Sequence, residues 1–99
     1  MKVNDFFSSF IKIHILHHAQ LEEVYGAWMI QELEEHGYQI SPGAIYPIFK
    51  SLERRGLLKS REEQNGKIKR RWYKCTPKGR QELAEAKVKL KELMSEILG

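Results

Sequence analysis

The stretch that decides the fold is LLKSREEQNGKIKRRWYKC, residues 57–75 of this 99-residue chain. Near its middle stands Asn65-Gly66, a dipeptide that is the strongest short-range signal for a β-hairpin. The segments on either side, residues 57–63 and 67–75, have the length and composition of strands. We therefore predict two antiparallel strands joined around Asn65-Gly66.

The chain before the hairpin has helical periodicity, with apolar residues recurring at intervals of three and four. The predicted helices cover about residues 4–18, 23–36 and 42–56. Ser41 followed by Pro42 is the order expected at a helix start, with the serine as N-cap and the proline in the first turn. Gly37 and Gly56 supply the left-handed residue that commonly follows the end of a helix.

After the hairpin, Thr76-Pro77 repeats the cap-then-proline order, and a final helix is predicted to about residue 98. Three short helices followed by a two-stranded wing make a winged helix-turn-helix, so the expected class is mainly α with one small β-hairpin. We assign residues 1–76 to the winged-helix unit and residues 77–99 to a terminal helix. The length and the hydrophobic fraction of 41% suit a small globular protein.

Basic residues are concentrated in the middle of the chain. Residues 50–80 hold twelve of its seventeen Lys and Arg residues but only three of its thirteen Asp and Glu residues. Both flanking segments are net acidic, so the overall formal charge of +4 conceals a strongly basic block. Such a block is the electrostatic footprint of a protein that binds a polyanion. A solvated charged face is the alternative that composition alone leaves open.

The third predicted helix has two distinct faces when its residues are placed every 100°. The apolar arc consists of Ile45, Ile48, Phe49 and Leu52. The opposite, small or cationic side consists of Gly43, Pro47, Lys50 and Arg54. A helix that enters the major groove of DNA needs this division. Gly43 and Ala44, near the helix start, would allow the backbone to approach phosphates closely, where the free N–H groups carry partial positive charge.

The second predicted strand alternates its side chains between two faces. One face receives Lys69, Arg71, Tyr73 and Cys75, and the other receives Arg70, Trp72 and Lys74. A basic wing can hold the flanking phosphate backbone or enter the minor groove. Because narrow minor grooves attract arginine, Arg70 or a tip lysine such as Lys67 is a candidate reader of groove shape. We expect Trp72 and Tyr73 to pack in the core and between strands.

The final helix has a heptad pattern, with apolar residues spaced three, four, three and four. The seam consists of Leu83, Ala86, Leu90, Leu93 and Ile97. It is expected to meet a second subunit, and packing on the first helix of the same chain is the alternative. A two-fold dimer suits DNA binding, since it would contact two half-sites about one helical turn apart.

Several of these motifs resemble those of the PadR family of bacterial transcriptional regulators. They are Tyr25-Gly26, Ser41-Pro42-Gly43-Ala44-Ile45-Tyr46-Pro47, Leu52-Glu53-Arg54-Arg55-Gly56-Leu57-Leu58, Arg70-Arg71-Trp72-Tyr73 and Thr76-Pro77-Lys78-Gly79-Arg80. The resemblance covers nearly the whole chain. It implies a winged helix, a dimer joined through the terminal and first helices, and usually a repressor. The short terminal region resembles the compact subfamily, which has one dimerisation helix.

The resemblance completes two sets of predicted site residues. It implies that Tyr46, Lys50 and the basic wing contact DNA, and that Phe6 and Phe10 of the first helix join the dimer contact. The predicted DNA-binding residues are Ser41, Gly43, Ala44, Tyr46, Pro47, Lys50, Arg54, Lys67, Lys69, Arg70 and Arg71. The predicted dimerisation residues are Phe6, Phe10, Leu83, Ala86, Leu90, Leu93 and Ile97.

A small-molecule effector is a further hypothesis. Some members of the family bind planar compounds between subunits, using an aromatic residue on the terminal helix. This chain has no aromatic residue after Tyr73, which speaks against that arrangement. Trp28 is the candidate substitute, because on the helical wheel it points away from the Met29, Ile30 and Leu33 face.

Other chemistry is not expected from the sequence. His14, His17 and His18 lie at i, i+3 and i+4, but no cysteine or carboxylate lies nearby in sequence to complete a zinc site. His17 also falls on the apolar stripe of the first helix, where a packed neutral histidine is usual. The sequence contains no phosphate-binding loop or nucleophile motif, so we predict no enzyme, no cofactor and no metal.

The remaining inferences concern location and partners. The single cysteine, Cys75, cannot form an internal disulfide and is expected to be a small buried hydrophobe, with a redox role as the alternative. With no apolar run of membrane-spanning length and no secretory signal, a cytoplasmic location is expected. The predicted partner is double-stranded DNA. A winged-helix module that binds an acidic protein is the alternative, and a metal- or ligand-responsive switch is compatible with either.

Overall fold

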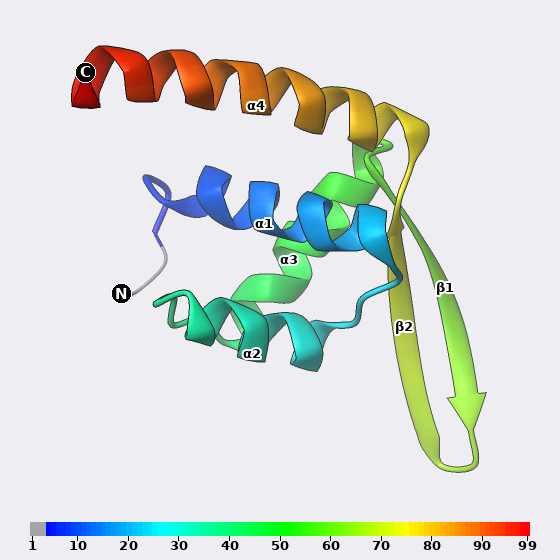
Figure 1. Ribbon diagram of the computed structural model, residues 1–99. Coiled ribbons are helices and arrows are strands. Elements are labelled where there is room, and N and C mark those ends of the chain that lie inside the picture. Colours follow the sequence, from blue (N-terminus) through cyan, green and yellow to red (C-terminus); the bar gives the residue numbers. More distant parts are fainter. Residues whose placement is uncertain (1–3) are drawn as a thin grey trace.

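The computed structural model describes residues 4–99 and shows, within them, four helices and one antiparallel hairpin (Figure 1). The elements are α1 (Ser8–Leu21), α2 (Gly26–Glu35), α3 (Pro42–Arg54), β1 (Leu58–Asn65), β2 (Ile68–Cys75) and α4 (Pro77–Leu98). In Figure 1, α1 lies between α4 and α2, α3 crosses behind them, and the hairpin extends away from the helices. The predicted winged helix-turn-helix with a long terminal helix is confirmed.

Buried apolar residues from every helix and both strands form one core. The amphipathic character of α3 was predicted correctly, because Ile45, Phe49 and Leu52 are buried and Ile48 packs at the core's edge. At the junction with the wing, the ring of Phe49 stacks on that of Tyr73, with centroids 4.3 Å apart and planes 8° from parallel. Helix α3 and the hairpin therefore share one aromatic contact.

The hairpin turn lies one residue later than its sequence signal suggested. Asn65 pairs with Ile68 in the ladder, so the two-residue loop is Gly66-Lys67 rather than Asn65-Gly66. Gly66 has φ +63°, and Lys67 does not have a positive φ. This combination fits a type II′ turn, which places glycine at the first central position, whereas Asn-Gly in the loop would have formed type I′.

The segment between α1 and α2 forms a short β-bridge, which is why α2 begins three residues later than predicted. Val24 donates its N–H to the carbonyl of Tyr73 at 2.9 Å and accepts the N–H of Tyr73 at 2.8 Å. Backbone groups committed to this pairing cannot enter a helix. The bridge attaches the start of α2 directly to β2.

The other helix ends differ from the predictions by a few residues. A turn closed by Asn4 precedes α1, which begins at Ser8 and continues to Leu21 instead of ending near residue 18. Ser41 occupies the N-cap position of α3, although its side chain makes no cap hydrogen bond. Thr76 caps α4 as expected, because its Oγ1 accepts the N–H of Gly79 at 3.0 Å. Within residues 4–99, no helix combines the length and apolar character that a membrane span requires.

The Phe49–Tyr73 stack generates a stability prediction. Replacing Phe49 with alanine should lower the free energy of unfolding by about 3–5 kcal/mol, because a fully buried aromatic ring leaves a cavity. The exposed Ile68 is the matched control, and Ile68→Ala should cost less than about 1 kcal/mol. Urea unfolding at one fixed protein concentration checks both values. Equal losses for the two variants would contradict the assigned core.

Candidate nucleic-acid interface

The outer face of α3 is solvent-exposed along its whole length. The exposed residues are Ser41, Gly43, Ala44, Tyr46, Pro47, Lys50 and Arg54. Every residue of α3 that was predicted to contact DNA therefore lies on the accessible side of the helix. Pro47 is accommodated within the helix, where the amide that it lacks would have bonded to the carbonyl of Gly43 near the first turn.

Carboxylates neutralise some of the basic side chains of the wing. Arg71 pairs with Glu62 at 3.0 Å, and Lys69 approaches the same carboxylate at 3.8 Å. Arg61 donates two hydrogen bonds to Glu23, at 2.8 and 2.9 Å. These hydrogen bonds lower the pKa of the Glu23 carboxyl below its usual value and raise the pKa of Arg61. Such exposed pairs contribute little to stability, but they fix where the cations point.

Among the described residues, four predicted DNA-binding cations form no ion pair, and three of them make no cation–π contact either. Lys50, Arg54 and Lys67 form no ion pair with any residue among those described. Lys50 and Arg54 lie one turn apart on α3, and Lys67 lies in the hairpin turn at the tip of the wing. Unpaired positive charge is thus present on both elements that are expected to face a duplex.

Arg70 is held against aromatic rings. Its guanidinium carbon lies 4.0 Å from the ring centroid of Tyr25 and 5.8 Å from that of Trp72. Tyr25 and Trp72 meet edge to face, with centroids 5.0 Å apart. The expectation that Trp72 packs between strands is confirmed, and its partners include Tyr25 just before α2. This cation–π cluster fixes Arg70 beside the start of α2.

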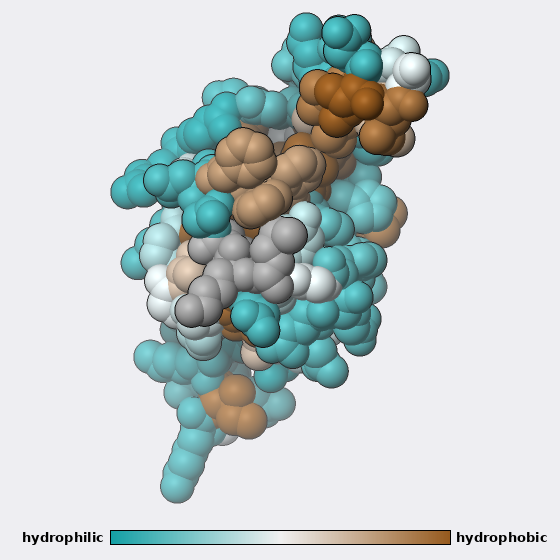
Figure 2. All heavy atoms as spheres, turned by 90° about the vertical axis from the view of Figure 1, so that its left-hand side faces the viewer, coloured by the Kyte–Doolittle hydropathy of each residue, from teal (hydrophilic) through white to brown (hydrophobic). Residues whose placement is uncertain are grey.

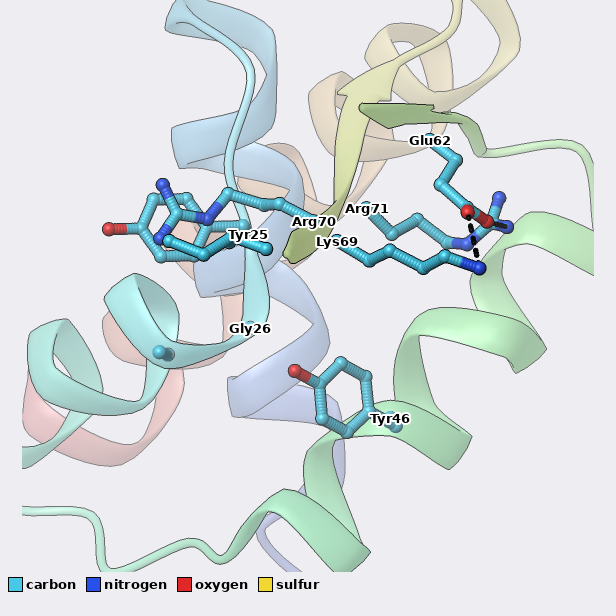
Figure 3. A pocket seen from close by; sticks show the side chains of 9 residues that line it. Tyr25, Gly26, Tyr46, Glu62, Lys69, Arg70 and Arg71 are labelled. Atoms are coloured by element: carbon cyan, nitrogen blue, oxygen red, sulfur yellow. Dashed lines mark hydrogen bonds and ion pairs between the residues drawn. The ribbon is translucent and has the colours of Figure 1, made fainter. Parts of the chain in front are cut away.

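A cleft of about 450 Å³ lies between the start of α2, the outer face of α3 and the wing (Figure 3). In Figure 3, Arg70 covers Tyr25 on one side, while Lys69 and Arg71 extend toward Glu62 on the other. The hydroxyl of Tyr46 points toward Gly26 across the cleft. Cationic and phenolic groups thus converge on one concave surface.

The close approach of Tyr46 requires glycine at position 26. A Cβ atom added there would lie 2.5 Å from the Tyr46 hydroxyl oxygen and 2.7 Å from its ring carbon Cζ. Those distances are far shorter than a van der Waals contact, so any larger residue would displace the ring. The Tyr46 ring therefore occupies the space that a side chain at position 26 would need.

Glu53 fixes the end of α3 to the wing. Its carboxylate accepts hydrogen bonds from the hydroxyl of Ser60 at 2.6 Å and from the Ser60 backbone N–H at 3.2 Å. Arg71 donates to the same hydroxyl at 3.1 Å. The angle between α3 and the hairpin is therefore set by hydrogen bonds as well as by the core. Neither Glu53 nor Ser60 was among the predicted site residues.

Comparison with known proteins places the chain among its relatives. Residues 15–85 match the family described as transcriptional regulator PadR-like. The chain belongs to the PadR-like family. Transcriptional regulator Rv3488 of Mycobacterium tuberculosis is 45% identical over 97 residues, which make up 98% of this chain and 91% of that protein. The resemblance noted in the sequence is thus confirmed, and members of this family are transcriptional regulators rather than enzymes.

Solved structures show the same fold. The PadR family transcriptional regulator of Eggerthella lenta superposes with a TM-score of 0.85 at 26% identity, covering 94% of this chain and 82% of that one. The PadR-like transcriptional regulator of Bacillus cereus gives a TM-score of 0.81 at 26% identity, with 95% and 93% of the two chains covered. Both support a PadR-like winged helix for this chain.

The predicted dimerisation residues divide into two groups. Leu83 is buried in the core of its own chain, and Ala86 and Leu90 are half-buried, so at this end of the seam packing within the chain occurs. Leu93 and Ile97 are 46% and 66% exposed. Phe6 and Phe10 of the N-terminal region are 79% and 40% exposed.

Figure 2 shows apolar side chains gathered on one face, from the free end of α4 toward the N-terminal end of α1. A groove of about 320 Å³ between α1 and α4 lies near this face and is lined by Phe10, Leu83, Leu90 and others. His17 also lines the groove and is exposed. The expectation of a packed His17 is therefore wrong for the single chain, because the apolar stripe of α1 on which it lies faces an open groove.

Two further expectations concern Trp28 and Cys75. Trp28 is 36% exposed and meets His18 edge to face at 5.4 Å, and its role in an effector pocket stays a prediction. Cys75 is a buried hydrophobe as expected, and burial raises the pKa of its thiol. A raised pKa reduces the reactive thiolate at neutral pH.

The Gly26–Tyr46 contact generates a double-mutant prediction. Gly26→Ala should destabilise the wild-type protein, because the methyl group displaces the Tyr46 ring. In a Tyr46→Ala background the same change should be neutral or stabilising by up to ~1 kcal/mol, since alanine is the better helix former. The expected coupling energy, measured by urea unfolding of all four proteins, is about 0.5–3 kcal/mol. Additive effects would show that the two residues do not touch.

Proposed function

We propose that this PadR-like regulator is a homodimeric repressor that binds a palindromic sequence in double-stranded DNA. The observation that carries the proposal is the exposed face of α3, whose cations Lys50 and Arg54 pair with no described carboxylate. The unpaired Lys67 extends this surface to the tip of the wing. We propose repression of transcription, not activation, because repression is the usual role of the family.

In this proposal α3 enters the major groove. Lys50 and Arg54 are four residues apart, which separates them by about 6 Å along the helix axis, or roughly two base-pair steps. Both side chains are long enough to reach guanine edges, and each good base contact provides about 1–3 kcal/mol of discrimination. Gly43 and Ala44 leave the start of α3 narrow enough to approach the backbone closely.

The wing and the cleft would contact phosphates. Arg70 is stacked on Tyr25, so its guanidinium is held beside the start of α2, where free helix N–H groups also attract an anion. This placement favours Arg70 as a phosphate contact and leaves Lys67, at the tip, as the candidate for the minor groove. A phosphate that bound Lys69 or Arg71 would have to displace the Glu62 carboxylate from these ion pairs or bind the cations beside it.

The second subunit would bind at the exposed end of α4. Leu93 and Ile97 of α4 are exposed, as are Phe6 and Phe10 of the N-terminal region. Figure 2 shows apolar side chains gathered from the free end of α4 toward the N-terminal end of α1. Contiguous exposed apolar surface of this kind is typical of protein interfaces. A C2 dimer made through these residues presents two recognition helices, which requires an inverted repeat.

DNA binding should depend steeply on salt and on the unpaired cations. We expect selection from a randomised duplex pool to enrich an inverted repeat. With the enriched duplex, Lys50→Ala should cost about 1–3 kcal/mol of binding and relax specificity at one position. Lys67→Ala should reduce the slope of log affinity against log salt by about 1. Fluorescence anisotropy across a salt series measures both.

Lys89→Ala is the matched control, because Lys89 lies on α4 outside the proposed surface and should leave affinity unchanged. Repression is checked by a reporter gene controlled by the enriched sequence. If no sequence is enriched and binding is weak and sequence-blind, the DNA proposal fails, and an acidic protein partner becomes the better explanation of the basic surface.

The dimer proposal has its own test. Leu93→Asp combined with Ile97→Asp should convert the dimer to monomers, since two buried charges without partners oppose association. Val88→Asp is the control, because Val88 is 67% exposed on the opposite side of α4 from the seam. Sedimentation velocity gives the mass of each protein. A wild-type protein that sediments as a monomer would contradict the proposal.

A further inference from the structure

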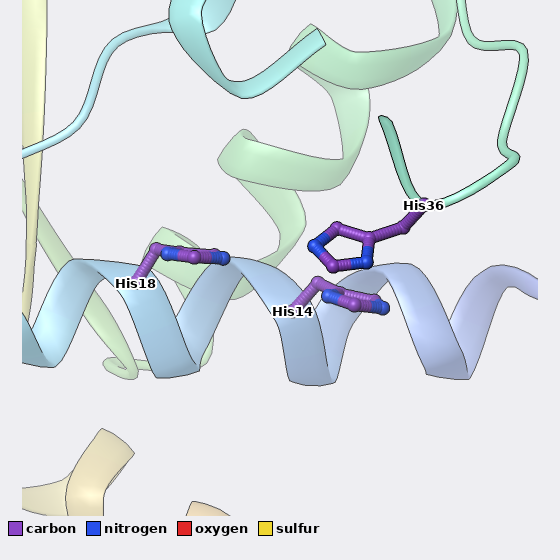
Figure 4. A group of neighbouring side chains, drawn as sticks. All are labelled: His14, His18 and His36. Carbon is purple, nitrogen blue, oxygen red and sulfur yellow. The ribbon is translucent and has the colours of Figure 1, made fainter. Parts of the chain in front are cut away.

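Three histidines from two helices converge in this fold. His14 and His18 project from the same side of α1, one turn apart, and His36 reaches them from the end of α2 (Figure 4). One ring nitrogen from each residue lies within 4.8 Å of one from each of the others. The rings of His14 and His36 have centroids 5.0 Å apart. The first helix contributes the pair seen in the sequence, and α2 supplies the third member.

A carboxylate adjoins the cluster. Glu32 Oε1 lies 3.4 Å from Nε2 of His18 and 3.3 Å from Nε2 of His36. Glu32 and His36 are four residues apart along the chain, like His14 and His18, so both pairs use the spacing that brings side chains together on one helical face. Glu32 therefore contacts two of the three imidazoles across the α1–α2 contact.

We propose that His14, His18, His36 and Glu32 form a binding site for a divalent transition-metal ion of the zinc class. Three imidazole nitrogens and one carboxylate oxygen are a donor set that suits tetrahedral Zn²⁺ and its neighbours Co²⁺ and Ni²⁺. Two nitrogens on one tetrahedral zinc ion lie roughly 3.3 Å apart. Small rotations of the rings, which lie near the surface, bring the donors to that separation.

Partial burial and two aromatic contacts surround His14 and His18. Burial, and then the neighbouring histidines, lower the pKa of His14, and burial lowers the pKa of His18. Neutral imidazole is the form that coordinates a metal ion. Tyr38 and Trp28 cover the cluster by edge-to-face contacts with His14 and His18, at 5.6 and 5.4 Å. Trp28, the suspected effector residue, thus lies beside this site.

A metal here would join the end of α2 to the middle of α1. The first helix also carries Phe10 of the proposed dimer contact, and α2 leads directly into α3. Metal binding would therefore affect both the contact between the two subunits and the position of α3. This regulatory consequence rests on the proposed DNA-binding function, whereas the metal site itself does not.

The site is tested with untagged, chelator-treated protein titrated with Co²⁺, whose visible absorption reports four-coordinate binding. The expected result is one Co²⁺ per chain, displaced by Zn²⁺ with loss of the absorption. His36→Ala and Glu32→Gln should each weaken Co²⁺ binding by more than about tenfold. Loss of a residue that only hydrogen-bonds to a metal ligand already costs about tenfold in affinity, so loss of a ligand should cost more. His17→Ala is the matched control, because His17 is a histidine of the same helix outside the cluster, and it should bind like wild type.

A second readout separates this site from adventitious surface binding. The chain has two tryptophans, so in Trp72→Phe only Trp28 reports, and bound Co²⁺ should quench its fluorescence with the same stoichiometry. Circular dichroism shows whether each variant is folded. Unchanged Co²⁺ affinity in folded His36→Ala, an equal loss in His17→Ala, or binding without quenching of Trp28 would each overturn the metal site.

The regulatory consequence is measured separately, on the enriched duplex. Zn²⁺ should change the affinity of wild type for DNA and leave that of His36→Ala unchanged. If Co²⁺ binds but DNA affinity does not respond, the site remains and the link between metal and DNA is wrong. If no duplex is bound with or without Zn²⁺ while Co²⁺ still binds, the DNA proposal fails and the metal site stands.

Discussion

The arrangement of α2, α3 and the wing depends on the packing around Tyr73. Its backbone pairs with Val24, which lies just before α2, and its ring stacks on Phe49 of α3. One residue of β2 therefore fixes both helices of the helix-turn-helix relative to the hairpin. Tyr73 makes both the ring stack and the two backbone hydrogen bonds with Val24, so rotation of the wing would break all three contacts at once. The wing is thus a rigid extension of the recognition helix.

This rigidity determines what the charges can do. Glu62 pairs with Lys69 and Arg71, and Glu23 pairs with Arg61, so these three cations of the hairpin are held in place. Among the predicted DNA-binding cations, Lys50, Arg54 and Lys67 have no described partner and lie on the outer face of α3 and at the wing tip. The ion pairs hold the paired cations in fixed positions. The unpaired cations can bind a polyanion and release its counterions. The basic block of the sequence is therefore divided into a structural part and an available part.

The sequence predicted the elements well because each has strong local signals. Thr76-Pro77 and Ser41-Pro42 mark helix starts by backbone chemistry, and the faces of α3 follow from its periodicity. The misplaced features depend on contacts distant in the chain. The bridge of Val24 with Tyr73 delays α2, and nothing within residues 20–30 alone reveals that partner. The turn moved to Gly66-Lys67 because ladder register, rather than the best dipeptide, determined which residues form the loop.

The same limit explains the candidate metal site. Within α1 the sequence offered histidines but no completing ligand, which led to the expectation of no metal. His36 and Glu32 are about twenty residues away and form a helical pair of their own, so only the packing of α2 on α1 unites the two halves. Each pair alone would pass for part of a solvated face, but the contact between α1 and α2 brings together three imidazoles with one adjoining carboxylate. Ligands that come from two helices have no fixed spacing in the sequence. Only the packing of the two helices brings them together.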